Sequence, residues 1–233
     1  MVDRVASIME CVARSKDGLT LTEVANALGA PVSTTQGLMN GLVATGYLDE
    51  RHRVYTLGIA PYMLNVLAGR PPVGAVLHEQ LQEVHAETGL TIMLSVAVGD
   101  ELIYVDHVSS EPRYAYYAEQ HLHRSLLRTS AGWLFLADRE QRDIWAYLSA
   151  APDDCAGYVD DFLERLTELR DTAVCISPAV GAEDDADGVS VALRENGRTV
   201  AVLGVIGLDA VVADRRDELL EVCLRHASSW GMR

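Results

Sequence analysis

The sequence has few of the residues that mark secreted or membrane-spanning proteins. Only four cysteines occur among 233 residues, and none form the CxxC spacing of zinc knuckles and redox motifs. No apolar run reaches the roughly 18–20 residues that a transmembrane helix needs. The first residues lack the basic-then-apolar order of a secretion signal. We therefore expect a cytoplasmic protein without a membrane anchor or disulfide framework.

Positive charge is also scarce. The chain has 19 Lys and Arg against 34 Asp and Glu, a net charge of −15. Because phosphate contacts need cations, this balance argues against nucleic-acid binding by most of the chain. Residues 1–60 are nearly neutral, however, with five cations and six anions. We expect DNA contact only there, with the acidic remainder repelled by phosphates.

Catalytic and metal-binding motifs are missing too. The chain contains no GxSxG, P-loop or GxGxxG sequence, so we predict that it is not an enzyme and holds no cofactor. His121 and His123 would share one strand face, but no third metal ligand accompanies them. The segment 183–188 resembles part of a calcium loop and lacks its later glutamate. We predict no metal site, and a small-molecule hydrolase that uses Ser130 is kept only as an alternative.

The first sixty residues carry three amphipathic segments. Val5, Ile8, Met9 and Val12 recur at helical spacing. Thr20 and Glu23 have capping-box spacing ahead of a second helix that Gly29 ends. A third helix is predicted over 32–45, with Pro31 at or just before its start and Ser33 or Thr34 as its cap. Its predicted core residues are Leu38, Met39, Leu42 and Val43. Two short helices joined at a glycine are typical of a helix-turn-helix.

A hairpin follows the third helix. Residues 47–50 and 54–57 have strand-like composition, with Arg51, His52 and Arg53 between them. This arrangement predicts the wing of a winged helix-turn-helix, whose cations contact phosphates or a minor groove. The third helix would lie in the major groove and present polar side chains to base edges. The predicted DNA-binding residues are Thr22, Ser33, Thr34, Gln36, Gly37, Asn40, Arg51 and Arg53.

The rest of the chain alternates helices with paired strands. Strands are predicted over 91–98, 101–108, 113–118, 188–193 and 199–208, the last two joined at Asn196-Gly197. Helices are predicted over 73–88, 131–137, 144–148, 162–169 and 219–227. This order predicts an α+β fold, an antiparallel sheet covered by helices.

Both halves resemble one family. GLTLTEVANALGAPVSTTQGLMNGLVATGYLDE followed by RVYTLG is similar to the DNA-binding domain of IclR regulators. TGLTIMLSVAVGDELIYVDHV, LHRSLLRTSAGWLFLAD and DGVSVALRENGRTVAVLGVIGL resemble the GAF-like effector domain of that family. The resemblance implies a winged helix-turn-helix over 1–58, a linker helix over 59–72 and an effector domain over 73–233. It also implies a homodimer or tetramer, paired through the DNA-binding module and the linker helix.

An effector site is implied around the turn at 127–132. Thr129 and Ser130 stand where they would cap a helix whose free N–H groups bind an anionic or carbonyl group. The predicted effector-binding residues are Ser95, Tyr104, Tyr116, Leu127, Arg128, Thr129, Ser130, Ala131, Gly132, Trp133 and Ser190.

Three positions depart from the family pattern. Gly37 replaces the usual arginine of the third helix, Trp133 replaces a lysine, and the segment at Ser190 lacks the usual cysteine and proline. The leading interpretation is a ligand-responsive transcription regulator, a repressor, that binds an operator in double-stranded DNA and a small organic effector. The alternative, which Gly37 and the acidic balance motivate, is a sensor or protein-interaction module without specific DNA binding.

Overall fold

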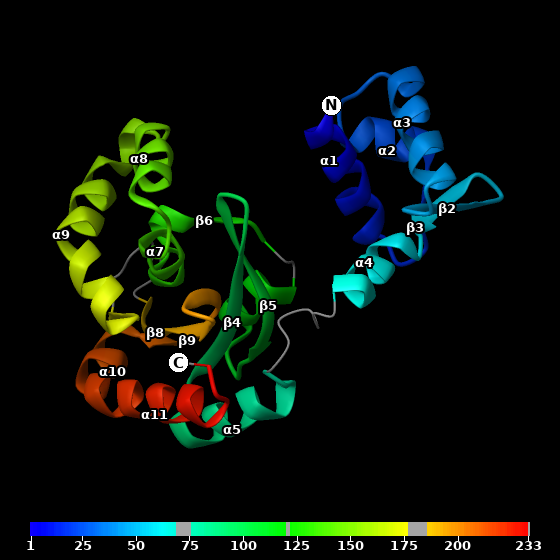
Figure 1. Cartoon of the computed structure of the whole chain (residues 1–233). Helices are drawn as coiled ribbons and strands as arrows, with labels where there is room; N and C mark the ends of the chain where they lie inside the picture. The colour runs from blue at the N-terminus through cyan, green and yellow to red at the C-terminus, as the bar shows by residue number, and fades with distance from the viewer. Residues whose placement is uncertain (69–75, 120–121, 177–185, 233) are drawn as a thin grey trace. The chain divides into compact units, whose positions relative to one another are not determined.

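The computed structural model describes residues 1–68, 76–119, 122–176 and 186–232. The chain forms two compact units, over residues 1–74 and 75–233. Figure 1 labels their helices and strands.

The N-terminal unit has three helices and a small antiparallel sheet. The helices are α1 (Val2–Ala13), α2 (Leu21–Ala27) and α3 (Val32–Ala44), and the linker helix α4 spans Ala60–Ala68. The predicted capping box forms, since the Thr20 hydroxyl accepts a hydrogen bond from the Glu23 N–H and the Glu23 carboxylate accepts one from the Thr20 N–H. Gly29, at φ +57°, makes the left-handed turn between α2 and α3.

The core of this unit differs in detail from the prediction. Ile8, Val12, Met39 and Leu42 are buried as expected, whereas Leu38 and Val43 are only partly buried. The predicted caps are wrong, because Pro31 is the N-cap of α3 and no side chain bonds there. The Ser33 and Thr34 hydroxyls are therefore left exposed on the first turn of α3.

The hairpin forms close to the predicted bounds. Strands β2 (Leu48–Arg51) and β3 (Val54–Leu57) pair antiparallel, which leaves only His52 and Arg53 in the turn. A strand that the sequence did not indicate, β1 (Leu19–Thr20), adds to the other edge of β3. The central position of β3 explains why Tyr55 is buried.

The C-terminal unit is built on an antiparallel sheet in the order β6-β5-β4-β9-β8-β7. The long strands are β4 (Thr91–Val98), β5 (Glu101–Val108), β8 (Ala186–Glu195) and β9 (Arg198–Leu208). The short strands β6 (Arg124–Ser125) and β7 (Val174–Ile176) form the edges and were not predicted. Asn196 and Gly197 both have positive φ in the β8–β9 turn, which confirms the predicted hairpin.

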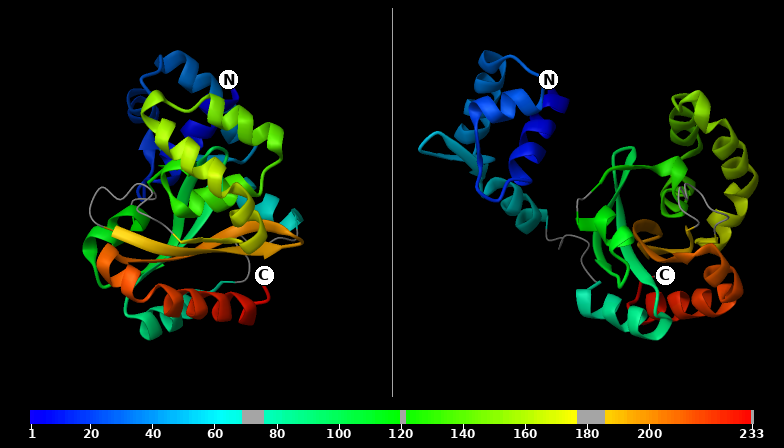
Figure 2. Two further views of the ribbon diagram at one scale, coloured as in Figure 1. Left: turned by 90° about the vertical axis from the view of Figure 1, so that its left-hand side faces the viewer. Right: turned by 180° about the vertical axis from the view of Figure 1, so that it is seen from behind.

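Helices cover both faces of this sheet, as Figure 2 shows. One layer contains α5 (His78–Thr88), α10 (Asp209–Asp214) and α11 (Arg216–Ser229). The other contains α7 (Ser130–Ala137), α8 (Gln141–Ser149) and α9 (Ala156–Thr172). The predicted α+β class is confirmed, and every residue of α7 from 131 to 137 is buried, as expected of a helix that is apolar on all sides.

Two predicted elements of this unit need correction. Residues 113–118 are not a strand but belong to helix α6 (Pro112–Glu119). Pro112 suits a first helical turn, and Tyr114 and Ala118, four residues apart, are both buried against a cluster that includes Met93. Helix α5 begins only at His78, after the extended Leu77, while Val73 lies outside the described residues.

Within the described part of the chain, no helix is long and apolar enough to cross a bilayer. Cys223 is buried, whereas Cys11 is only partly buried.

Candidate functional site

Helix α3 presents a polar, solvent-exposed face. Ser33, Thr34, Gln36 and Asn40 are all exposed, as is Thr22 on α2. Thr35, by contrast, is buried, and its hydroxyl donates a hydrogen bond to the Pro31 carbonyl at 3.1 Å. The exposed set contains the donors and acceptors that read base edges in a major groove.

Gly37 lies on the same helix in open space. A Cβ built at Gly37 meets no atom within 4 Å, so the position has room for any side chain. Packing therefore does not require glycine there.

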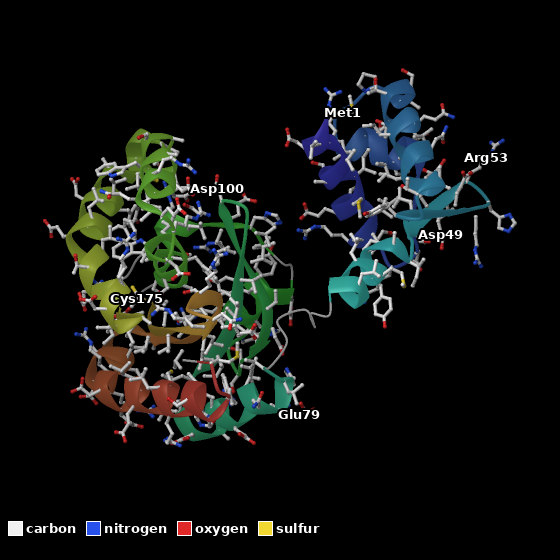
Figure 3. The ribbon with its side chains drawn as sticks, viewed as in Figure 1. Met1, Asp49, Arg53, Glu79, Asp100 and Cys175 are labelled. Carbon is white, nitrogen blue, oxygen red and sulfur yellow. The ribbon has the colours of Figure 1, made fainter. Side chains whose placement is uncertain are left out.

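The wing carries its cations on an unusual turn. His52 and Arg53 have φ of 53° and 64°, a left-handed conformation that favours Asn-Gly in two-residue hairpins. Figure 3 shows Arg53 at the tip of the hairpin, while Arg51 is the last residue of β2 and not part of the turn. Both arginines are exposed.

The predicted effector segment forms a turn that leads into α7. A single 3-10 turn, η1, spans Leu126–Arg128, and the Ser125 hydroxyl caps it by accepting a hydrogen bond from the Leu127 N–H. Thr129 then caps α7, accepting from the Gly132 N–H at 3.1 Å. The capping by Thr129 was predicted and the cap by Ser125 was not; a serine directly before an apolar pair is the signal that indicates such a cap.

Gly132 is required by the close approach of this turn. A Cβ there would lie 2.1 Å from the Leu126 carbonyl oxygen and 2.4 Å from the Leu126 Cα. Both contacts are with backbone, which cannot move aside cheaply. The glycine lets η1 pack directly on the first turn of α7.

Two predicted effector residues meet at the N-terminus of α7. The Ser130 Oγ lies 2.9 Å from the Ser190 Oγ on β8, although the two are sixty residues apart in sequence. Ser190 is buried, as is Ser95 on β4, whose hydroxyl donates to the Val202 carbonyl at 3.3 Å. Buried hydroxyls on a sheet face beside a helix N-terminus can orient a small polar ligand.

Other predicted members of the set lie elsewhere. The Arg128 guanidinium turns toward α9, where its Nε donates to the Cys155 Sγ at 3.4 Å and its Nη2 pairs with Asp154. These hydrogen bonds raise the pKa of Arg128, and the guanidinium holds the pKa of Asp154 below its usual range. The Cys155 sulfur and the Asp154 carboxylate therefore engage the Arg128 guanidinium on the side of α9.

The aromatic candidates are also dispersed. Trp133 is buried in the core, donates its indole N–H to the Leu127 carbonyl at 2.7 Å and meets the Phe162 ring edge-on at 5.7 Å. Arg165, which the sequence did not indicate, stacks over the same indole at 5.5 Å. Tyr116 is exposed on α6, and Tyr104 is partly buried against the core. The remaining candidates Leu127 and Ala131 are buried beside the turn.

Metal chemistry finds no support in the described part of the chain, where no three His, Cys, Asp or Glu side chains gather around a common point. His123 bonds to Glu101, whereas His121 and most of the calcium-like segment fall outside the described residues.

Two family models together match most of the chain. The IclR helix-turn-helix domain matches residues 1–52, and the bacterial transcriptional regulator IclR C-terminal domain matches residues 67–230. The chain belongs to the IclR family. This IclR-family protein is thus a transcription regulator with a DNA-binding helix-turn-helix and an effector-binding C-terminal domain.

Solved structures agree with this regulator in fold. An IclR-family regulator from Brucella abortus matches with a TM-score of 0.67 at 18% identity, covering 99% of this chain and 90% of that one. A regulator from a Silicibacter species gives 0.72 at 20%, covering 98% and 94%. An IclR homologue from Microbacterium hydrocarbonoxydans, solved with 4-hydroxybenzoate, gives 0.73 at 17%, covering 98% and 96%. No curated protein sequence matches the chain.

Proposed function

We propose that this regulator is a homodimeric or tetrameric repressor whose hold on an operator changes when a small organic molecule binds its C-terminal domain. The observation that carries the proposal is the exposed polar face of α3 next to a basic two-residue wing. Because its operator lies in bacterial DNA, we place its action in the cytoplasm.

We assign base reading to α3 and backbone contact to the wing. Gln36 and Asn40 have amides that bond adenine edges bidentately, and Ser33 and Thr34 suit bases or phosphates at the helix start. Thr22, at the first turn of α2, suits a phosphate contact. Arg51 and Arg53 supply the cations that α3 itself lacks.

We assign effector binding to the N-terminus of α7. The Ser130–Ser190 hydroxyl pair, which lies at the N-terminus of α7, supports a ligand with a carboxylate or carbonyl oxygen. The homologue solved with 4-hydroxybenzoate supports a small organic compound as the ligand class. Domain bounds of 1–58, 59–72 and 73–233 accompany this assignment.

The test is a salt-titrated binding assay with the DNA upstream of the protein's own gene. Arg53→Ala should weaken binding to every sequence and lower the salt slope by about one per subunit, because one phosphate contact is lost. Asn40→Ala should weaken the specific site by roughly 1–3 kcal/mol and spare random DNA. Arg142→Ala, which removes a cation that is 84% exposed on α8, is the matched control.

Gly37→Arg adds the missing cation and should tighten DNA binding. The side chain has open space, and replacing a mid-helix glycine also stabilises α3 by roughly 0.5–1 kcal/mol. Folded dimer with no specific retardation at low salt would overturn the proposal and favour the sensor without DNA specificity. Derepression of a reporter by the effector, lost in the Ser130→Ala and Ser190→Ala variants, tests the repressor and effector assignments.

A further inference from the structure

A cavity lies in the C-terminal unit on the α8 side of the η1 turn. Its volume is about 670 Å³, within the range of small-molecule sites. It is bounded by the β4–β5 turn, the η1 turn, the end of α7, helix α8 and the link to α9. Its lining residues are Gly99, Asp100, Ser125, Leu127, Arg139, Asp143, Ala146, Tyr147, Ala150, Ala151, Pro152 and Cys155. We call it the α8 cavity.

The α8 cavity is separate from the serine pair at the start of α7. Ser130 and Ser190 do not line it. Arg128 does not line it either, although it donates a hydrogen bond to the lining residue Cys155. It touches the effector turn through Ser125 and Leu127. A ligand here would therefore not compete for the Ser130–Ser190 hydroxyls.

One wall is apolar and built from small side chains. The buried Leu127 and the small residues Ala146, Ala150, Ala151 and Pro152 all line the cavity. Such a wall leaves room for a flat ring, which gains free energy by removing its apolar surface from water.

The polar wall holds two hydroxyls close together. The Tyr147 hydroxyl lies 3.3 Å from the Ser125 Oγ, and each hydroxyl has one donor and two acceptor positions. Ser125 uses one acceptor position for the Leu127 N–H. Positions that the two hydroxyls do not use can bond a hydroxyl or ammonium group of a ligand.

The charged residues of the lining determine which sign of charge a ligand can carry. Arg139 is the only cation of the lining, and it is engaged by Asp100 at 2.7 Å, by the Gly99 carbonyl at 2.6 Å and by the Tyr147 ring at 5.5 Å. Asp143 adds a second carboxylate, paired with the largely exposed Arg142. Both carboxylates are paired with arginines and the Arg139 guanidinium is committed to Asp100, so the described lining offers an anionic ligand no unengaged cation.

We propose that the α8 cavity is a second small-molecule site, which takes a compact ring compound that bears a hydroxyl or ammonium group and no anionic group. It differs in charge preference from the site proposed at α7, where helix N–H groups favour an anionic or carbonyl oxygen.

The test uses benzyl alcohol, benzylamine and benzoate, which share one ring and differ in charge. Calorimetric titration of the full chain should show benzylamine and benzyl alcohol binding with Kd of roughly 1 mM, the range that ligands of this size reach. Ala150→Phe fills the cavity from the exposed C-cap position of α8 and should weaken the binding of both probes by about tenfold or more. Ser149→Phe, the neighbouring exposed position outside the lining, should leave both unchanged.

Ala146→Phe is the second filling variant if Ala150→Phe does not fold. Binding of the two probes should also survive Ser130→Ala and Ser190→Ala together, which alter only the other site. The proposal is overturned if neither probe binds, if filling the cavity leaves their affinity unchanged, or if benzoate binds as well as benzylamine and is lost with Ala150→Phe.

Discussion

At the scale of single residues, the structure separates glycines that packing requires from glycines that it does not. Gly132 lies against the Leu126 backbone, whereas Gly41, in the middle of α3, has no atom within 4 Å of a built Cβ. The first glycine therefore shapes the effector turn, and the second only lowers the helix propensity of α3.

Gly132→Ala should destabilise the C-terminal unit by about 2–3 kcal/mol, because the new methyl group forces the η1 turn away from α7. Gly41→Ala is the matched control and should raise stability by roughly 0.5–1 kcal/mol. Denaturant unfolding of both variants measures the difference. Equal stability of Gly132→Ala and the parent chain would contradict the close packing of this turn.

At the scale of elements, α5 and α11 are joined across their layer by one carboxylate. Glu87 on α5 pairs with Arg225 on α11 and accepts a hydrogen bond from the His226 Nε2 at 3.1 Å. These two side chains hold the pKa of Glu87 below its usual value of 4.5. The pair is open to solvent, so its effect is screened by salt.

Because the folded pKa of Glu87 is lowered, its stabilising contribution is present above about pH 4.5 and is lost as the pH falls through the lowered value. Glu87→Gln should flatten the dependence of unfolding free energy on pH in this acidic window. Urea unfolding between neutral and acidic pH measures it, with Glu83→Gln, an exposed glutamate of the same helix, as control. Identical pH profiles for Glu87→Gln and the parent would show that the pair contributes nothing.

At the scale of the whole molecule, the apolar surface of α4 bears on assembly. Tyr62, Leu64 and Leu67 are exposed by 63%, 52% and 77%. Leu64 and Leu67, three residues apart, lie on one side of the helix, and exposed apolar side chains grouped in this way mark an interaction surface. In a regulator that reads paired half-sites, a second copy of the same helix is the partner we propose.

Leu64→Glu combined with Leu67→Glu should convert the assembly to monomers and weaken operator binding, since one subunit then reads only a half-site. Sedimentation equilibrium and DNA titration on the same samples measure both effects. Val98→Glu, at a position 54% exposed at the end of β4, is the control. An unchanged mass for the α4 variant would place the assembly surface elsewhere.

The sequence by itself determined the features that depend on neighbours along the chain. The capping box at Thr20 and Glu23, the Asn196-Gly197 hairpin and the Thr129 cap all follow from local hydrogen bonding and backbone preference. The helical spacing of apolar residues in α1 and the strand-like composition of β4 and β5 likewise predicted where these elements lie, because both patterns depend on neighbours along the chain.

Only the tertiary structure decided what depends on distant partners. Residues 112–119 became a helix because a sheet face was available to bury Tyr114 and Ala118, and the edge strands β6 and β7 exist because longer strands supply their hydrogen bonds. Ser130 met Ser190, while Arg128 turned to Asp154, through packing across many residues of chain. Local patterns carry no information on which of two nearby surfaces a long side chain reaches, because that choice depends on where the fold places its partners.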